Sequence, residues 1–369
     1  MAVHDNQDLV ASAADELSAW LAAHPAPTGE QLAQAGYVVP HWPAPWGLGA
    51  APADQLVIDA ILRTANVRRP DNPIGIGWAG PTLLAAGTVE QQQRWLPGLL
   101  SGEEFWCQLF SEPAAGSDLS ALSTQAVRDG DEWVVTGQKV WTSYAHRAKF
   151  GILLARTSPE AERHHGITYF VCPMDAPGLE VRPLVDMTGN HTFNEVFLDE
   201  VRIPADHVIG EVNDGWRLAK VTLANERVSL SGDGLMWGMG PVIDDLVALA
   251  RRIGVDAVAA ERLTSLWVRA EALRMLKLRL VAAVLAGRTP GPEASVRKAL
   301  ADEVGQDAAT LAVDLLGMAA VAGVLEPHDV MWSWCFTFSP SLTIGGGTSV
   351  VQRNIIAERV LGLPRDVEG

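Results

Sequence analysis

The sequence is poor in cysteine and in positive charge. Its 369 residues contain three cysteines, Cys107, Cys172 and Cys335, and none is spaced as a C-x-x-C pair. This scarcity argues against a disulfide framework and favours a reducing compartment. Lys and Arg number 28 against 44 Asp and Glu, which gives a formal net charge of −16. We therefore expect no nucleic-acid or anionic-membrane partner, because phosphate binding needs clustered basic side chains.

Long apolar runs and common ligand motifs are also scarce. The longest apolar run, 280–286, is far too short to span a bilayer. The N-terminus carries acidic residues where an export signal would have a cationic start, so we expect a cytoplasmic protein. His164, His165 and the other histidines lack the spacing of metal ligands, and no G-x-G-x-x-G follows a strand pattern. Neither a metal centre nor a nicotinamide site is expected.

The periodicity of apolar residues changes twice along the chain. Helical spacing comes first, and the helix expected at 89–100 is preceded by the capping-box pair Thr88 and Gln91. Strand patterns follow at 105–110, 124–128, 133–135, 140–143, 150–156, 167–173, 179–183 and 194–201. Helical spacing then returns at 214–249, 256–286, 293–321 and 348–361. We expect an N-terminal helical domain (1–103), a middle β-barrel domain (104–211) and a C-terminal four-helix bundle (212–369).

Two neighbouring segments contain the most informative residues. The first, QLFSEPAAGSD at 108–118, is predicted to be a strand that runs into a turn of small residues after Pro113. Backbone N–H groups and the hydroxyls of Ser111 and Ser117 could approach a flat polar ring or a pyrophosphate there. The second segment, WVVTGQKVWTS at 133–143, has the β-branched and aromatic content of a hairpin strand with a glycine bend.

In this order and spacing, the two segments resemble those that line the flavin site in the middle domain of acyl-CoA dehydrogenases. The family patterns are SEP-x-AGSD and V-x-G-x-K-x-W-x-(T/S), and Ser111 stands where many members have Thr. The resemblance implies FAD as cofactor. It assigns contacts to Gln108, Phe110, Ser111, Ser117, Trp141 and Ser143. On its own, Trp141 could equally be an ordinary core aromatic.

A third segment, TIGGGTSVVQR at 343–353, resembles the family's E-G-G-T-S-E-I-Q-R. This likeness adds Thr348 to the cofactor contacts, although the glycines alone also fit a simple turn before a capped helix. Many members have their catalytic Glu at the position that Gly346 occupies here, and glycine cannot accept a proton.

In a second arrangement within the family, the base is a Glu on the first bundle helix, just before an Arg. Glu226 and Arg227 match that pattern, and Gly346 would leave room for a carboxylate from another helix. The resemblance therefore implies Glu226 as the base, with Ser117, Arg227 and Gly346 near the substrate. The alternative is that Glu226 and Arg227 form a solvated pair on a helix face.

The implied reaction converts an acyl-CoA thioester to a trans-2-enoyl-CoA, with proton abstraction by Glu226 and hydride transfer to flavin N5. An electron-transferring flavoprotein would be the oxidant. The chain would assemble as a homodimer or homotetramer, or as a heterotetramer with a homologous chain. Two alternatives are a non-catalytic partner subunit, suggested by Asp314 and the altered Gly345-Gly346 pair, and a flavin oxidase. A branched, long or steroid-like acyl group fits a base on the bundle helix.

Overall fold

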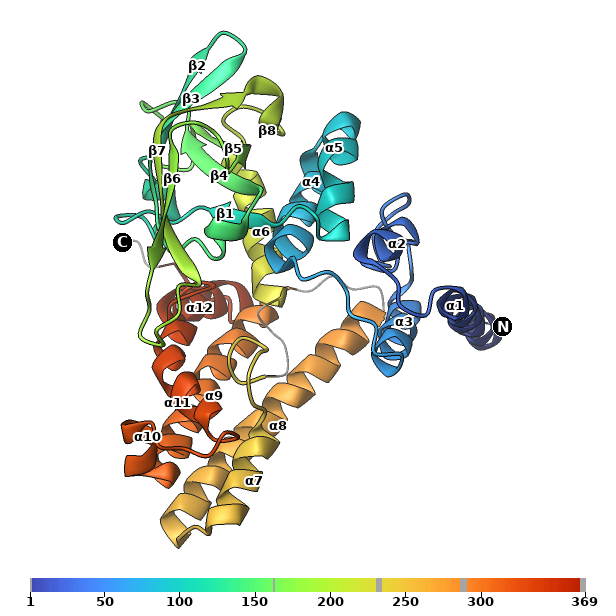
Figure 1. The fold of residues 1–369 in the computed structure, drawn as a ribbon, viewed down its shortest axis with the longest axis vertical. Coiled ribbons are helices and arrows are strands. Elements are labelled where there is room, and N and C mark those ends of the chain that lie inside the picture. Colours follow the sequence, from blue (N-terminus) through green and yellow to red (C-terminus); the bar gives the residue numbers. More distant parts are fainter. Residues whose placement is uncertain (1, 162, 230–233, 286–290, 366–369) are drawn as a thin grey trace. The chain divides into compact units, whose positions relative to one another are not determined.

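The structure is a computed structural model that describes residues 2–161, 163–229, 234–285 and 291–365 (Figure 1). The chain divides into two compact units. Unit 1 comprises Met1–Leu184 and His191–Asn225, and unit 2 comprises Val185–Asn190 and Glu226–Gly369. The order of helices, sheet and helices along the chain confirms the predicted α–β–α fold class.

Unit 1 begins with five α-helices. They are α1 (Ala2–Ala23), α2 (Gly29–Gln34), α3 (Pro52–Thr64), α4 (Gly80–Ala86) and α5 (Val89–Ser101). The predicted capping box at α5 is confirmed, since the Thr88 hydroxyl accepts from the Gln91 N–H and the Gln91 side chain accepts from the Thr88 N–H. Gly102 ends α5 in the left-handed conformation, with φ of 80°.

The rest of unit 1 is built on one eight-stranded sheet. The strands are β1 (Trp106–Leu109), β2 (Gln125–Asp129), β3 (Glu132–Lys139), β4 (Phe150–Arg156), β5 (Ile167–Pro173), β6 (Leu179–Leu184), β7 (Phe193–Pro204) and β8 (Val208–Ile209). Their order is β6-β7-β3-β2-β4-β5-β8, and β1 pairs parallel to β4. Strands β4 and β5 are buried almost throughout, which explains why their sequences are apolar at nearly every position.

One predicted strand is wrong. The strand expected at 140–143 is absent from the sheet, because β3 already ends at Lys139 and the backbone then turns sharply. Trp141 and Tyr144 have φ values of 60° and 57°, in the left-handed region that is incompatible with an extended strand. The predicted hairpin around Gly130 is confirmed, since β2 and β3 pair antiparallel with Asp129 opposite Glu132.

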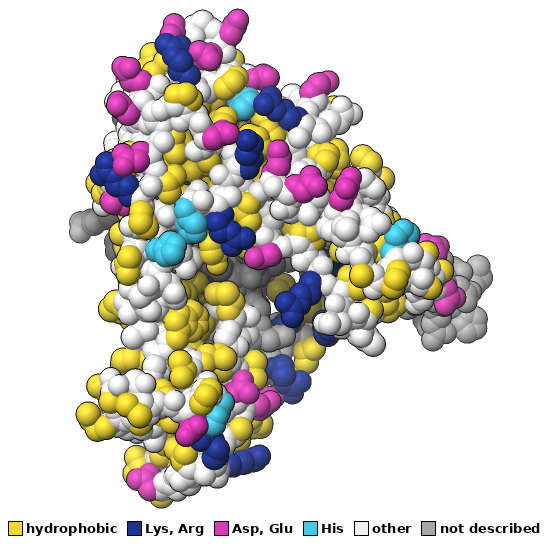
Figure 2. Space-filling view, in the orientation of Figure 1, with side chains coloured by type: hydrophobic (Ala, Val, Ile, Leu, Met, Phe, Trp, Pro, Cys, Tyr) yellow, Lys and Arg dark blue, Asp and Glu magenta, His cyan; other side chains and the backbone are white. Residues whose placement is uncertain are grey.

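Charged side chains of both signs are mixed on the surface of the strands. On the face drawn in Figure 2, Lys and Arg side chains lie among Asp and Glu side chains. Arg202 on β7, for example, contacts Asp129 and Glu132 at 3.0 and 2.9 Å. These pairs place basic groups against acidic ones on the sheet.

Unit 2 is mostly helical, and helix α6 (Gly215–Ser229) crosses from unit 1 into it at Glu226. The other helices are α7 (Ile243–Ile253), α8 (Ala257–Leu285), α9 (Glu293–Leu316), α10 (Met318–Ala322), α11 (Val330–Phe338) and α12 (Ser349–Ile355), which a π-helix (Ile356–Val360) continues. Helix α9 packs against α7, α8, α11 and α12. Among the described helices, none is long and apolar enough to cross a membrane.

Two predicted bundle helices are interrupted. The helix expected over 214–249 is wrong at 234–242, where Gly234 pairs with Gly238 and Met236 with Met239 in short bridges. Closely spaced glycines and Pro241 oppose a helix there. The helix expected over 293–321 breaks at Gly317, with φ of 60°. The aromatic stretch 332–340 forms α11 and its end, and Trp332 packs in the core of unit 2.

Candidate active site

The two motif segments of unit 1 lie side by side. The Val140 N–H donates to the Ser111 carbonyl oxygen at 2.9 Å, and Lys139 Nζ donates to the Phe110 carbonyl oxygen at 3.0 Å. The small-residue turn after β1 and the end of β3 therefore form one continuous surface. Gly137 is needed beside it, since a Cβ there would lie 2.3 Å from Thr124 Oγ1.

A buried ion pair joins these two segments. Lys139 Nζ lies 2.8 Å from Glu112 Oε1, and both side chains are almost completely buried. Glu112 also accepts from the N–H and hydroxyl of Ser123 and from the N–H of Thr124. The prediction did not include this pair. The signal that could have found it is Lys139, the single charged residue of the segment 133–143, which needs an acidic partner if it is buried.

The hydrogen bonds decide the charge state of this pair. Burial by itself raises the pKa of Glu112, but the charge and hydrogen bond of Lys139 and the bonds from Thr124 and Ser123 outweigh it and lower the pKa to about 2. Burial lowers the pKa of Lys139 to about 8, against the attraction of Glu112. At neutral pH both groups are charged, so the pair fixes the turn firmly to β3.

The predicted flavin contacts on the first segment differ in exposure. Phe110 is buried and meets Tyr169 edge to face at 6.0 Å, so its side chain supports the sheet. Gln108 and Ser111 are half-buried, and Ser117 is exposed. At the neighbouring Gly116, an added Cβ would meet no protein atom within 4 Å. The turn thus presents hydroxyls and open space at its surface, as a bound ring or pyrophosphate requires.

Trp141 and Ser143 lie on the adjoining segment. Trp141 is 60% exposed, so the interpretation as a core aromatic is wrong. The backbone around it is held by Asn194, whose carbonyl oxygen accepts from the Thr142 N–H and whose side chain donates to the Thr142 carbonyl oxygen, both at 3.0 Å. An exposed indole on a fixed backbone, with the half-buried Ser143 two residues later, fits a flat aromatic group such as the isoalloxazine of FAD.

Glu226 lies on α6 and is 8% exposed. The alternative of a solvated pair is therefore wrong for Glu226. The side chain of Arg227 lies outside the described residues. One turn earlier, Thr222 is buried and its hydroxyl lies 2.8 Å from Thr82 Oγ1 and 3.0 Å from the Tyr169 hydroxyl. These contacts fix the part of α6 that belongs to unit 1.

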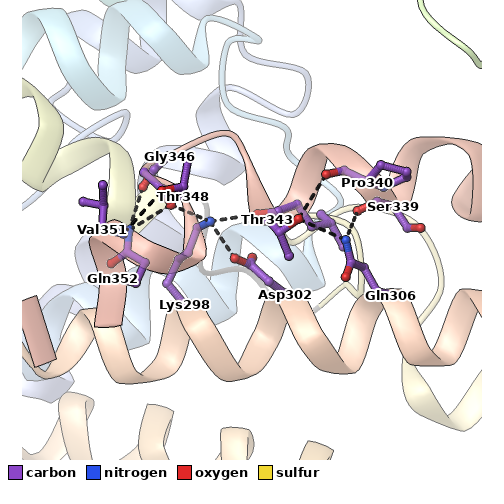
Figure 3. A network of polar contacts seen from close by, with 12 residues as sticks. Lys298, Asp302, Gln306, Ser339, Pro340, Thr343, Gly346, Thr348, Val351 and Gln352 are labelled. Atoms are coloured by element: carbon purple, nitrogen blue, oxygen red, sulfur yellow. Dashed lines mark hydrogen bonds and ion pairs between the residues drawn. The ribbon is translucent and has the colours of Figure 1, made fainter. Parts of the chain in front are cut away.

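The third segment forms a turn in unit 2. Gly346 and Gly347 have φ values of 65° and 89°, which favour glycine. Thr348 caps α12, since its hydroxyl accepts from the Val351 N–H. The Thr348 hydroxyl can still donate one hydrogen bond to a ligand. The structure thus places Gly346 and Thr348 together, on a turn that Lys298 and Gln352 contact (Figure 3).

Comparison with protein families gives a match along nearly the whole chain. Models of the N-terminal, middle and C-terminal domains of acyl-CoA dehydrogenases match residues 7–103, 107–201 and 213–361. The chain belongs to the acyl-CoA dehydrogenase family. Members of this family are FAD-binding oxidoreductases that act on CH–CH bonds, which confirms the predicted cofactor and class of reaction.

Similar curated proteins come from mycobacteria. The chain is 47% identical over 334 residues to acyl-CoA dehydrogenase FadE34 of Mycobacterium tuberculosis, which covers 90% of this chain and 46% of that protein. The chain thus spans about half the length of FadE34. It is 40% identical over 344 residues to acyl-CoA dehydrogenase IpdE1 of the same organism, covering 92% of this chain and 88% of that protein.

Solved structures with the same fold include heteromeric enzymes. The Tcur3481–Tcur3483 steroid ACAD matches with a TM-score of 0.77 and 31% identity, covering 98% of each chain. The ChsE4–ChsE5 complex from Mycobacterium tuberculosis matches with a TM-score of 0.76 and 30% identity, covering 97% of this chain and 98% of that one. These relatives favour dehydrogenation over the alternatives of a non-catalytic subunit or an oxidase.

Proposed function

We propose that this chain dehydrogenates a bulky acyl-CoA thioester to the trans-2-enoyl-CoA, with Glu226 as the base. The observation that carries the proposal is a buried carboxylate on α6, at the position that one arrangement of the family uses. The segment 343–348 offers no carboxylate, since Gly346 stands at the alternative position of the base. A steroid ACAD among the structural relatives supports a branched, long or steroid-like acyl group.

The chain's own residues would perform three tasks. The surface formed by Gln108, Ser111, Ser117, Trp141 and Ser143 would hold the isoalloxazine, with Thr348 as a further cofactor contact. The bound flavin would accept a hydride from the β carbon. The Glu226 carboxylate would accept the proton from the α carbon, and Arg227, Ser117 and Gly346 would orient the thioester.

We further propose an electron-transferring flavoprotein as oxidant, and assembly with a second copy or with a homologous chain. The ChsE4–ChsE5 complex supports the second form of assembly. Three domains at 1–103, 104–211 and 212–369 agree with where the periodicity of the sequence changes. Three buried, free thiols fit a reducing, cytoplasmic compartment.

A spectroscopic experiment tests the role of Glu226. The purified wild-type chain, with any partner chain it needs, should be yellow and should bleach when a suitable acyl-CoA from a panel is added without oxygen. Glu226→Gln should bind FAD equally but bleach about 10²–10⁴-fold more slowly, because general-base catalysis contributes that much. Glu261→Gln, an exposed substitution on α8, is the matched control. Bleaching of Glu226→Gln at the wild-type rate would remove Glu226 from the mechanism.

A further inference from the structure

A second buried lysine lies in unit 2, beside the segment that contains Gly346. Lys298 on α9 and Asp302, one turn later, are each 2% exposed. Lys298 Nζ donates to Asp302 Oδ2 at 2.6 Å, to the Leu342 carbonyl oxygen at 2.8 Å and to the Gly347 carbonyl oxygen at 3.1 Å (Figure 3). An ammonium has three protons, so all of its donors are used within the protein.

The two backbone contacts of Lys298 lie on either side of Gly345 and Gly346. A second side chain, Gln352 on α12, donates to the carbonyl oxygens of Gly346 and Gly347 at 2.9 and 3.2 Å. Residues 345–347, called here the glycine turn, have no side chains with which to hold their own conformation. The carbonyl groups of Gly346 and Gly347 are instead fixed by Lys298 of α9 and Gln352 of α12.

Side-chain packing also restricts the conformation of the glycine turn. A Cβ at Gly345 would lie 2.6 Å from Cη2 of Trp237, and that indole meets Phe338 edge to face at 5.3 Å. The turn therefore packs against the Trp237 indole, while Lys298 and Gln352 hold its carbonyl groups. Burial of an ammonium is costly, and an apolar residue at position 298 would avoid that cost. Such a residue, however, could not donate hydrogen bonds to the Leu342 and Gly347 carbonyl groups.

We propose that Lys298 is a positioning residue of the active site: it holds the glycine turn in the conformation that receives the acyl thioester, with Asp302 as its counter-charge. This inference rests on the proposed function, which puts Gly346 next to the substrate. Lys298 does not touch the substrate. It acts through the Leu342 and Gly347 carbonyl groups, and so sets the path of the backbone through Gly346.

The carboxyl group of Asp302 makes the contacts of Lys298 sensitive to pH. Burial raises the pKa of Asp302 to about 7, although the hydrogen bond and charge of Lys298 oppose the shift and Glu303 adds to it. Both Lys298 and Asp302 line a cavity of about 290 Å³, whose other charged lining residues are Asp244 of α7, Glu271, Arg274 and Lys277 of α8, and Arg297 of α9. As the pH falls through about 7, Asp302 becomes neutral and Lys298 loses its ionised partner.

Two variants test the proposal. Lys298→Met keeps the length of the side chain but removes the donors, and Asp302→Asn keeps an acceptor that does not titrate. Backbone hydrogen exchange at 344–347 should quicken about tenfold in Lys298→Met, which corresponds to the loss of one net hydrogen bond. The FAD content should not change, while KM for the acyl-CoA should rise more than kcat falls. In Asp302→Asn, the inflection of kcat/KM near pH 7 should disappear. Lys149→Met, which removes an exposed pair with Asp175, is the control.

Each result decides the matter. Unchanged exchange at the glycine turn in Lys298→Met would overturn the proposal, and so would faster exchange with unchanged KM, since Lys298 would then only support the fold. If Lys298→Met does not fold, Lys298→Gln, which is shorter but keeps a polar group, takes its place, and unchanged exchange at 344–347 with unchanged KM in Lys298→Gln contradicts the proposal. A wild-type chain that no acyl-CoA reduces would overturn the proposed function itself. An active wild type with unaffected variants would overturn the role of Lys298 alone.

Discussion

Each unit contains a buried lysine that pairs with a carboxylate beside a turn of the proposed site. In unit 1, Lys139 and Glu112 join the turn after β1 to the end of β3. In unit 2, Lys298 and Asp302 hold the glycine turn. The distances from ammonium nitrogen to carboxylate oxygen are alike, 2.8 and 2.6 Å. Each lysine also donates to backbone carbonyl groups, Lys139 to one and Lys298 to two. The difference lies in the carboxylates, because Glu112 accepts three more hydrogen bonds from Ser123 and Thr124.

This difference shows that a buried carboxylate takes its charge state from the neutral donors around it as well as from its cation. Burial opposes ionisation of both groups, and both have a lysine at hydrogen-bond distance. With the extra donors, the pKa of Glu112 falls to about 2, whereas the pKa of Asp302, which lacks such donors and is repelled by Glu303, rises to about 7. The carboxylate of the pair in unit 1 is therefore ionised throughout the neutral range, whereas the carboxylate of the pair in unit 2 titrates within it.

The largest expected effect follows from breaking the pair in unit 1. Lys139→Met leaves Glu112 buried without its cation, and such a loss costs about 3–5 kcal/mol of the free energy of unfolding. Urea unfolding, followed by circular dichroism, measures it. Glu112→Gln together with Lys139→Met should recover part of the loss, because no charge then remains buried. A cost below about 1 kcal/mol for the single variant would show that the pair is not a structural necessity.

The next effect concerns pH, where the two pairs should act with opposite signs. The pKa of Glu112 is lowered on folding from 4.5 to about 2, so its contribution is present above pH 4.5 and is lost as the pH falls toward 2. The pKa of Asp302 is raised from 3.8 to about 7, so folding binds a proton and stability falls as the pH rises from about 4 to about 7. In the wild type, thermal unfolding should show stability that falls between about pH 4 and pH 7. In Asp302→Asn this fall should disappear. An unchanged slope would remove Asp302 as its source.

The smallest effect is expected for an exposed ion pair, which serves as the reference for the two buried pairs. Lys149 and Asp175 lie 3.0 Å apart, but their side chains are 51% and 69% exposed. Water competes for both groups, so Lys149→Met should change the free energy of unfolding by less than about 1 kcal/mol. The same urea titration measures it. If Lys149→Met lowered the free energy of unfolding as much as Lys139→Met, burial would not explain why the two ion pairs differ.

The sequence allowed the fold class and several element boundaries to be predicted. Local signals suffice for these, as at the capping box of Thr88 and in the apolar strands β4 and β5. The partner of Lys139 could not be predicted, because Glu112 lies 27 residues away and the two meet only through the sheet. Trp141 shows the same limit, since its β-forming neighbourhood predicted a strand, whereas its φ of 60° takes it out of the sheet.

The three cysteines offer separate reporters of local opening in the two units. Cys107 and Cys172 are buried in β1 and β5 of unit 1, and Cys335 is buried in α11 of unit 2. Burial raises the pKa of all three thiols, so each reacts with an alkylating reagent only when its surroundings unfold. The rates of alkylation at the three sites, followed by mass spectrometry, would therefore time the unfolding of each half of this enzyme in a single sample.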